Sequence, residues 1–418
     1  MLPRPDVLIV GGGLAGLAAA GAAARAGAST IVLDDQASRG IDPRHWLRNS
    51  ALAHDGATAT ELTADAVAAG AVVRSDTSVW GCFPDLTVTV TDLSSTFSLH
   101  PKRVIVATGA HDLPVHFPGS SLLGVITASE LLQESLDDGS KPGRRHALLG
   151  SPEDVGMIAM AIRRAGGEIV AHARLGDDVR AEGAARVEAF WTAESRHPCE
   201  VIVVAVRQAA NELARMAGCR VIYHPHGGGF IAVLDAHRQG TVSGIFVAGD
   251  AAGPCAREVA IAEGDLAGLA AATSIGIGDP REVDQARTRL VTLAPGRLVA
   301  SLVEPGISRS IDDATIICRC ENVRADQIRE AISYGAGSID DVKRRTRAGM
   351  GLCQGVECMA PIADLLHEDG QIPYTAIAPM TARPPIRSIS LGQLGALDQK
   401  SANVSHADEV LPQTDGHP

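Results

Sequence analysis

The sequence predicts an α/β fold with two Rossmann-like dinucleotide-binding domains, followed by a small helical module that carries a cysteine site. Three observations predict it: a glycine-rich turn after the first apolar strand, a second strand–turn–helix–strand unit in mid-chain, and four closely spaced cysteines near the C-terminal end. The length of 418 residues suggests two or three domains, and apolar residues make up 45% of the chain, enough for several cores.

The first nucleotide-binding unit starts close to the N-terminus. Residues 6–10 form a short apolar strand, which runs into a turn with G-x-G-x-x-G spacing and then into an Ala- and Leu-rich helix. In such a turn the first glycine makes the tight bend, the second lets the backbone approach a pyrophosphate, and the third lets helix and strand pack closely. Free N–H groups at the helix start face the phosphates. The residues of this turn expected to contact the nucleotide are Gly11, Gly13, Leu14, Ala15 and Gly16.

An acidic pair follows the second strand of this unit. Residues 29–33 form that strand, and Asp34 and Asp35 come directly after it. An acid at this place hydrogen-bonds ribose hydroxyls and disfavours a 2′-phosphate. A glycine motif alone is weak, but strand, glycines, helix, strand and acid in this order are specific for a dinucleotide site.

Two later strands end in polar residues that suit a flavin nucleotide. One apolar strand ends in Thr108-Gly109, and another, from residue 244, ends in Gly249-Asp250. With these strands the chain resembles the two-domain flavoproteins of the glutathione-reductase type. The resemblance implies FAD at the first site, with the Asp250 carboxylate on the flavin ribitol and a helix from near Glu258 directed at the flavin ring.

A second βαβ unit occupies residues 146–171, but its turn departs from the glycine pattern. Gly150 fills the first glycine place, whereas Pro152 stands at the second, Val155 at the third, and Gly156 comes one residue late. Proline removes an N–H and adds bulk where a pyrophosphate would approach, and valine blocks close packing. The unit is therefore expected to fold as a dinucleotide-binding domain that is a poor site for NAD(P)H.

Four cysteines form the candidate metal site. Cys318 and Cys320 are a C-x-C pair, and Cys353 and Cys358 are a C-x4-C pair. Thiolates select zinc or iron–sulfur clusters. Structural zinc sites commonly use C-x2-C pairs, so the spacing favours iron–sulfur and leaves zinc as the alternative. Two disulfides would require an oxidising compartment, and no secretion signal is visible.

The surroundings of these cysteines are helical and carry a family resemblance. Apolar spacing predicts a helix between the pairs, Ser338 is expected to cap a second helix, and Cys358 opens a third, whose free N–H groups favour thiolates. Cys318-Arg-Cys320-Glu, the run Lys343-x-x-Thr-Arg-Ala-Gly-Met-Gly-x-Cys353-Gln-Gly and Cys358 resemble the [2Fe–2S] domain of the bacterioferritin-associated-ferredoxin type.

Fusion of such a domain to a flavoprotein is similar to the alpha subunits of opine oxidases, dye-linked D-hydroxyproline dehydrogenase and hydrogen cyanide synthase. The similarity runs from Val7 to about Leu397. It implies FAD and a [2Fe–2S] cluster in this chain, a partner FAD subunit that oxidises a C–N bond, and in some assemblies a small third subunit with another [2Fe–2S] cluster. The domains expected are 1–115 with 236–290 for FAD, 116–235 for the degenerate NAD(P)-type domain, 312–370 for the [2Fe–2S] domain, 371–398 for a C-terminal return segment and 399–418 for a disordered tail.

The bulk composition narrows the function further. The net charge of -12 argues against a nucleic-acid or anionic-membrane binder, and no apolar run is long enough to span a bilayer. We therefore expect a cytoplasmic protein whose membrane contact, if any, comes through partners. No constellation of His, Ser or Lys identifies a catalytic acid or base. The expected function is an electron-transfer subunit of a hetero-oligomeric, dye-linked amine dehydrogenase. A self-contained NAD(P)H-dependent flavin reductase and a non-catalytic nucleotide-binding scaffold remain open alternatives.

Overall fold

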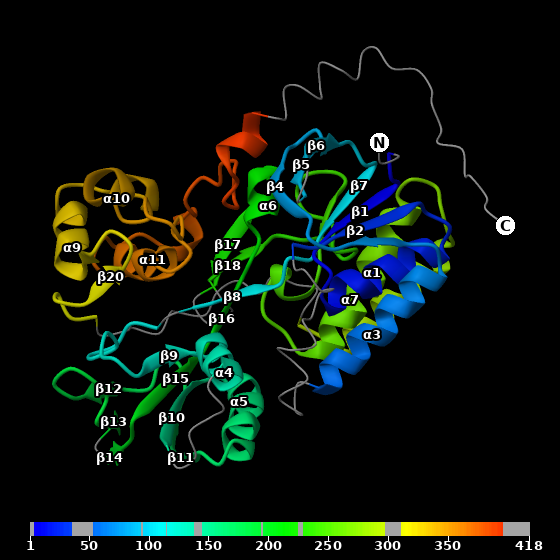
Figure 1. Cartoon of the computed structure of the whole chain (residues 1–418). Helices are drawn as coiled ribbons and strands as arrows, with labels where there is room; N and C mark the ends of the chain where they lie inside the picture. Colours follow the sequence, from blue (N-terminus) through cyan, green and yellow to red (C-terminus); the bar gives the residue numbers. More distant parts are fainter. Residues whose placement is uncertain are drawn as a thin grey trace.

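The computed structural model describes residues 4–35, 53–92, 95–113, 115–137, 144–193, 195–224, 229–296 and 311–395. Figure 1 shows three regions: a helix-covered sheet in blue and yellow-green, a second sheet in cyan and green, and a helical module in yellow and orange. A ribbon of short strands, labelled β8, β16, β17 and β18, lies between the three regions.

The first region is built on a five-stranded parallel sheet in the order β19-β7-β1-β2-β3. The central strands are continuous apolar runs, as expected for a parallel sheet covered on both faces. The strand order reverses between β1 and β7, so a crevice opens at the carboxyl ends of these two strands. The strands are β1 (Val7–Val10), β2 (Thr30–Leu33), β3 (Val72–Arg74), β7 (Arg103–Val106) and β19 (Ile245–Val247).

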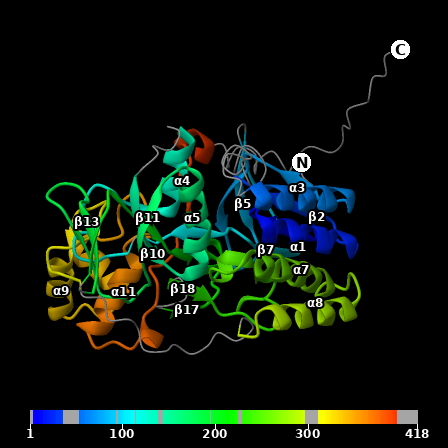
Figure 2. The same ribbon diagram turned by 90° about the horizontal axis from the view of Figure 1, so that it is seen from below.

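Small residues hold the helices of this region close together. A Cβ atom added to Gly264 would lie 2.1 Å from the carbonyl oxygen of Ala15, and one added to Gly268 would lie 2.3 Å from that of Ala19. Such close backbone contact explains how a chain with 3% aromatic residues still packs a core. The helices, side by side in Figure 2, are α1 (Leu14–Arg25), α3 (Ala53–Ala68), α7 (Arg257–Thr273) and α8 (Pro280–Leu293). An antiparallel sheet precedes β7 and consists of β4 (Ser78–Cys82), β5 (Val88–Thr91) and β6 (Thr96–Leu99).

The second region is a four-stranded parallel sheet in the order β11-β10-β15-β9. The predicted strand–turn–helix–strand unit is present as β10, α5 and β11, which confirms two Rossmann-like regions. Its elements are β9 (Val125–Thr127), α4 (Ala128–Asp137), β10 (Arg145–Gly150), α5 (Pro152–Arg164), β11 (Glu168–Ala173) and β15 (Val201–Ala205). An antiparallel meander joins β11 to β15 and consists of β12 (Val179–Glu182), β13 (Ala189–Thr192) and β14 (Ser195–Pro198).

After Ala205 the chain leaves the second sheet. Leu213 and Ala214 pack into the core of the first region, and Tyr223 and Phe230 pack into the core of the cysteine module. The predicted second domain extends to residue 235, and we propose instead that its boundary lies near residue 206. The connecting elements are β8 (Ala110–Asp112), which pairs with β16 (Arg207–Ala209), then α6 (Glu212–Met216), and the pair β17 (Val221–His224) and β18 (Gly229–Ala232).

The cysteine module is helical, as predicted. The helix predicted between the cysteine pairs begins at Ala325, because Val323 and Arg324 pair with the strand that ends at Cys318. Ser338 caps its helix as expected, with its Oγ accepting a hydrogen bond from the Asp341 N–H at 3.1 Å. The elements are β20 (Ile316–Cys318), β21 (Val323–Arg324), α9 (Ala325–Ser333), α10 (Ile339–Thr346) and α11 (Met359–Glu368).

A buried polar network fixes this module to the connecting ribbon. The hydroxyl of Tyr223 in β17 donates to Asp364 Oδ1 in α11 at 2.8 Å, and the Tyr374 hydroxyl donates to the same oxygen at 3.2 Å. All three side chains are buried in one apolar cluster or against it. The module is therefore packed onto the nucleotide-binding part and does not hang from a linker.

The chain then returns to the first region through η2 (Tyr374–Ala376) and the segment drawn in orange and red in Figure 1. The backbone N–H of Ile386 donates to the carbonyl of Trp80 in β4 at 3.0 Å. The predicted tail, 399–418, lies outside the described residues. Among the residues that are described, no helix has both the length and the apolar character to cross a bilayer.

Candidate flavin and iron–sulfur sites

A cavity of about 800 Å³ opens at the carboxyl ends of β1 and β7, where the strand order reverses. Its size falls within the range of ligand and cofactor pockets, roughly 300–1,000 Å³. Of the residues predicted to bind the nucleotide, those that line the cavity are Gly11, Gly13, Leu14, Ala15, Asp34, Asp35, Thr108, Gly109 and Asp250. Gly16 and Gly249 lie behind this lining.

The first turn has the backbone geometry that a dinucleotide requires. Gly11 has φ +104°, and a Cβ there would lie 2.2 Å from the carbonyl oxygen of Ala107. A Cβ at Gly16 would lie 1.9 Å from the carbonyl oxygen of Gly11, so this glycine allows helix and strand to touch. A Cβ at Gly13, by contrast, meets nothing within 4 Å. No side chain caps the start of α1. The turn therefore presents uncapped N–H groups to open space, which fits a pyrophosphate.

The two acids after β2 take different positions. Asp34 is buried, and its Oδ2 accepts a hydrogen bond from the Gly12 N–H at 2.8 Å, which holds its carboxylate beside the turn. Asp35 is exposed, and its Oδ2 lies 3.9 Å from Arg387 Nε on the return segment. Asp34 is thus placed at the inner wall, and Asp35 lies at a mouth that the return segment helps to close.

The Gly-Asp pair after β19 is held by a buried ion pair. Gly249 has φ +67°, and its N–H donates to Glu263 Oε2 at 2.8 Å. Glu263, in α7, also lies 3.0 Å from the Arg238 guanidinium, and both side chains are almost completely buried. This arrangement fixes the turn that presents Asp250 to the cavity. The neighbouring Thr108 donates its hydroxyl to the carbonyl of Ala210.

Arg207, in β16, is a pocket residue that the sequence did not reveal. Its guanidinium contacts the Asp250 carboxylate and lies 2.8 Å from Asp154 Oδ1, which comes from the second region. Burial opposes the charge of Arg207, but the two carboxylates raise its pKa above the ordinary value. The Arg207 guanidinium therefore connects Asp250, the acid predicted to bind the ribitol, to Asp154 in helix α5 of the second nucleotide-binding unit.

Three further pocket residues also escaped sequence reasoning. One is His111, whose Nε2 lies 3.3 Å from Glu212 Oε1 at the pocket wall. Burial works against the charge of Glu212, but the hydrogen bond with His111 lowers its pKa. Ile386 and Arg387 reach the cavity from the return segment. No local spacing marks these residues, because they come from segments far apart in the chain.

The second nucleotide turn is closed by its own side chains. Ser151 caps α5 by accepting the Asp154 N–H at 3.1 Å, and its hydroxyl donates to Asp154 Oδ2 at 2.9 Å. The other carboxylate oxygen of Asp154 accepts from Arg207 Nε at 3.0 Å. Helix N–H groups that would face a phosphate are thus capped, and a negative charge stands where the phosphate would bind. The structure agrees with a poor NAD(P)H site.

The four cluster cysteines form two pairs, each with one member from either sequence motif. Cys318 and Cys358 are buried and share a hydrogen bond, whereas Cys320 is exposed and interacts with the half-buried Cys353. That shared hydrogen bond, helped by backbone N–H groups, lowers the pKa of Cys318 to about 6. The same contact and burial raise the pKa of Cys358, so the first thiolate forms readily and the second needs a metal charge.

The pairing bears on the choice between zinc and a cluster. Two cysteine pairs, each drawn from both sequence motifs, suit two irons joined by sulfides. Three of the other cysteines, Cys82, Cys199 and Cys219, are buried, and burial raises the pKa of Cys82 to about 12.

The flavin cavity and the cysteine site are connected through neighbouring residues of β16. Arg207 lines the cavity, and Gln208, the next residue, donates from Nε2 to the carbonyl of Val356 at 2.6 Å. Val356 lies in the loop between Cys353 and Cys358. Nearby, the guanidinium of Arg215 lies 3.5 Å from Met359 Sδ, at the start of α11. Two adjacent residues of one strand thus contact both sites.

Comparison with known proteins agrees with both sites. Residues 5–151 match the pyridine nucleotide-disulphide oxidoreductase family, and residues 316–368 match the BFD-like [2Fe-2S] binding domain. An opine oxidase subunit of Rhizobium meliloti (strain 1021) is 28% identical, over 94% of this chain and 98% of that protein. Hydrogen cyanide synthase subunit HcnB of Pseudomonas aeruginosa is 26% identical, over 86% and 92%. Over most of its length the chain is similar to subunits of opine oxidase and hydrogen cyanide synthase.

The two matched family models imply a flavoprotein with a [2Fe–2S] domain, so the cofactors of this chain are FAD and a [2Fe–2S] cluster. The structure of L-proline dehydrogenase from P. horikoshii agrees with the fold, with a TM-score of 0.74 at 24% identity, over 93% of this chain and 79% of that chain. The open turn at Gly13 fits FAD, and the paired thiols fit the cluster.

Proposed function

We propose that this chain is the electron-transferring subunit of a heteromeric dye-linked dehydrogenase that oxidises an amino-acid-derived amine, such as an opine or hydroxyproline. The observation that carries the proposal is the pair Arg207 and Gln208, which contact the flavin cavity and the cluster loop from adjacent positions. When bound, FAD exchanges electron pairs and the cluster exchanges single electrons. A chain that holds the two sites this close is suited to pass electrons between them.

The residues that would hold the cofactors follow from the geometry. The uncapped start of α1 and Gly13 would receive the FAD pyrophosphate, Asp34 the ribose hydroxyls, and Asp250 the ribitol chain. The cysteine thiolates that would bind the irons are Cys318, Cys320, Cys353 and Cys358. The rigid contact between Gln208 and Val356 would keep the cluster loop fixed relative to the cavity.

Substrate oxidation is assigned to a partner for a physical reason. The charged side chains at this cavity are paired with one another, Arg207 with Asp154 and Asp250, and His111 with Glu212. A general base for amine oxidation needs a lone pair directed at the substrate. The opine oxidase relative and HcnB are both named as subunits of larger enzymes. A partner flavoprotein that holds the amine is therefore part of the proposal.

The test is co-expression with the neighbouring reading frames, followed by affinity purification and an assay with an amine substrate and a dye acceptor. We expect a stable hetero-oligomer whose dye reduction falls at least tenfold when Cys358 is changed to Ser, while the partner keeps its flavin. Cys199→Ser, a buried cysteine of the second region, is the matched control and should leave the rate unchanged. A chain that purifies alone and oxidises the amine by itself would refute the proposal.

The self-contained NAD(P)H reductase is the second candidate, and the capped second turn speaks against it. Anaerobic addition of NADH to the purified chain separates the two functions. The proposal predicts that the flavin absorbance stays unchanged over many minutes, whereas a reductase would lose it within seconds.

A further inference from the structure

The cluster site has one solvent-facing edge. Cys318 and Cys358 are buried, but Cys320 is exposed, and the loop that follows α10 folds over it. A Cβ added to Gly351 would lie 2.1 Å from the Cβ of Cys320, so the two residues beside Gly351 flank this cysteine. They are Met350, 40% exposed, and Leu352, 99% exposed. Two exposed apolar side chains therefore flank the exposed cluster cysteine.

Two arginines lie beside this apolar point, in a chain whose net charge is -12. Arg319, between the first two cysteines, is exposed and pairs with no carboxylate among the described residues. Arg347 is 71% exposed and lies 2.9 Å from Glu321, which partly offsets its charge. The basic residues of 343–345 come before Thr346, and Arg344 among them is paired with Asp341 at 2.5 Å. Arg319 and Arg347 therefore place positive charge beside the exposed cysteine.

We propose that Arg319, Cys320, Arg347, Met350 and Leu352 form a docking face for an acidic one-electron carrier protein, which binds transiently and exchanges one electron with the cluster. The inference rests on the proposed electron-transfer function and names its partner. A small apolar centre flanked by charge is typical of transient redox encounters, whereas permanent subunit interfaces are larger and more apolar. Arg319 and Arg347 would steer an acidic carrier towards this face and repel a basic one.

The probe is a plant-type [2Fe–2S] ferredoxin with an acidic surface, whose low potential of roughly -400 mV makes electron transfer to the oxidised chain favourable. Two readouts are measured on the holoprotein at low ionic strength: the Kd for oxidised ferredoxin by calorimetry, and the second-order rate at which reduced ferredoxin bleaches the cluster. One electron passes from the reduced ferredoxin to the oxidised cluster. Reduced methyl viologen, a small cation, serves as a reductant that needs no docking face.

Three variants test the face. Arg319→Glu and Leu352→Ser should each weaken binding and slow ferredoxin-driven reduction by about tenfold, while reduction by methyl viologen keeps its rate or rises. Arg347 has φ +69°, a conformation that asparagine tolerates, so Arg347→Asn removes the charge without straining the helix end. It should lower the affinity for ferredoxin and the rate of ferredoxin-driven reduction several-fold. If Arg319→Glu or Leu352→Ser disturbs the cluster, because each lies beside a ligand cysteine, Arg347→Asn still tests the docking face.

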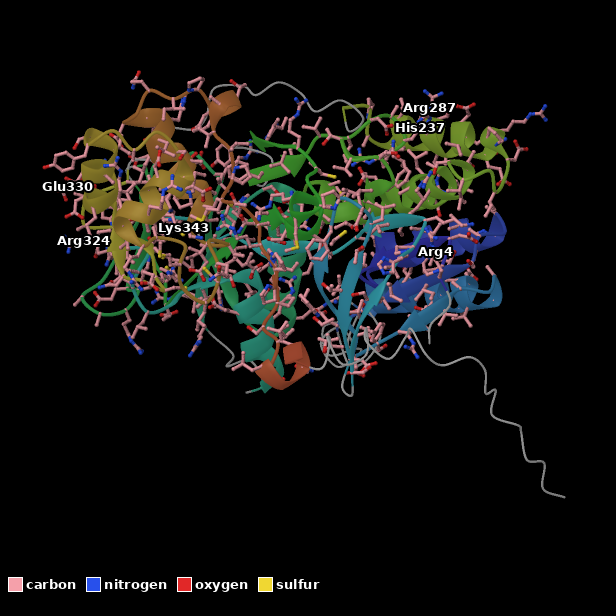
Figure 3. The ribbon with its side chains drawn as sticks, turned by 90° about the horizontal axis from the view of Figure 1, so that it is seen from above. Arg4, His237, Arg287, Arg324, Glu330 and Lys343 are labelled. Atoms are coloured by element: carbon pink, nitrogen blue, oxygen red, sulfur yellow. The ribbon has the colours of Figure 1, made fainter. Side chains whose placement is uncertain are left out.

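Matched controls lie on α8, at the far end of the molecule from Lys343 in Figure 3. Arg287→Glu makes the same charge change as Arg319→Glu, and Leu293→Ser makes the same polarity change on a side chain that is 45% exposed. Both controls should match the wild type. The wild-type rate should fall steeply between low and physiological salt, because the attraction is electrostatic.

Several outcomes would overturn the inference. Equal rates and Kd values for the face variants and the α8 controls would show that ferredoxin docks elsewhere. Loss of a dimer in Leu352→Ser would show that a second copy covers the face, and protection of Leu352 from hydroxyl radicals in the purified hetero-oligomer would show a permanent subunit there. The ferredoxin measurements need no partner subunit. A negative result there would overturn the docking face and leave the heteromeric function untouched. Failure to co-purify a partner would overturn the heteromeric function and leave the docking face untouched.

Discussion

The two nucleotide turns of this molecule share a topology and differ in what they leave open. In the first, α1 begins without a side-chain cap, and the space beside Gly13 is empty. In the second, Ser151 caps α5, and the first turn of the helix carries the Asp154 carboxylate, which is bound to Arg207. The strand–turn–helix unit therefore forms in both regions, but only the first offers free N–H groups to a phosphate.

A βαβ unit can therefore fold without forming a ligand site. The parallel pairing of strands and the apolar faces of the helices suffice to build both sheets. Binding needs in addition a glycine where the pyrophosphate passes and uncompensated N–H groups. In the second unit the helix start has become a wall of the first site, because Asp154 holds Arg207 against the flavin cavity.

The largest expected effect is the loss of FAD from Gly13→Val. A Cβ at this position meets no protein atom within 4 Å, so the chain should fold, but the valine would fill the space that the pyrophosphate needs. Flavin content of the purified protein should fall by at least tenfold. Gly156→Val makes the same change beside the second turn, also in open space, and should leave the flavin content unchanged. Equal flavin in both variants would place the cofactor elsewhere.

A second prediction concerns restoring the glycines of the second turn. Pro152→Gly with Val155→Gly recreates the G-x-G-x-x-G spacing, yet we expect no reduction of the flavin by NADH. The reason is that Ser151 and Asp154 still cap the helix and oppose a phosphate. Anaerobic stopped-flow mixing with NADH measures this. Rapid flavin bleaching in the double variant would mean that the glycines alone determine NADH binding. The caps at Ser151 and Asp154 would then not explain the difference between the two turns.

A smaller effect is expected from Arg207→Met. The change leaves Asp154 and Asp250 facing one another without a cation, so the Kd for FAD should rise about tenfold, and unfolding should become easier by about 1–3 kcal/mol. Fluorescence titration with FAD and urea unfolding measure the two effects. Arg145→Met removes an exposed arginine paired with Glu200 in the second region and serves as control. A wild-type Kd in Arg207→Met would show that the bridge does not support the flavin site.

The smallest effect lies at the start of the first sheet. Lys102, followed by Ser29, lowers the pKa of Asp6 to about 2, and Lys102 Nζ lies 2.8 Å from Asp6 Oδ1. Asp6→Asn should lower the free energy of unfolding by about 1 kcal/mol at neutral pH, since Lys102 is half exposed and screened. Because the folded-state pKa is depressed, this stabilisation is complete above the ordinary pKa of 3.8 and is lost as the pH falls towards 2.

Urea unfolding across that pH range checks the prediction, with Glu200→Gln as the matched change at the start of the second sheet. Its pair with Arg145 is more exposed, so the loss should be smaller. A difference between Asp6→Asn and the wild type that persists unchanged at pH 2 would contradict the assignment.

The features that could be predicted from the sequence depend on residues that lie close together along the chain. The turn from Gly11 to Gly16, the second strand–turn–helix unit and the caps at Ser338 and Cys358 depend on neighbours a few positions away. The start of α9 at Ala325 is not marked in this way, because the pairing of Val323 with β20 is a strand contact that helical spacing does not show.

Residues that meet only through the tertiary fold could not be found in this way. Arg207 reaches Asp154 and Asp250 from 53 and 43 positions away, and Arg387 comes to the flavin mouth from beyond the cluster module. The boundary near residue 206 that we propose for the second domain depends on contacts of the same kind. The apolar residues of α6 and β17 look alike in sequence, whichever core receives them.

The central claim is that electrons from an amine reach the cluster of this chain. The most direct measurement is anaerobic addition of the amine substrate to the purified hetero-oligomer, followed by electron paramagnetic resonance of the frozen sample. We predict that the signal of a reduced [2Fe–2S] cluster appears in the wild type and is absent in Cys358→Ser, while the partner's flavin is still bleached. A cluster that stays oxidised during steady dye reduction would contradict the account.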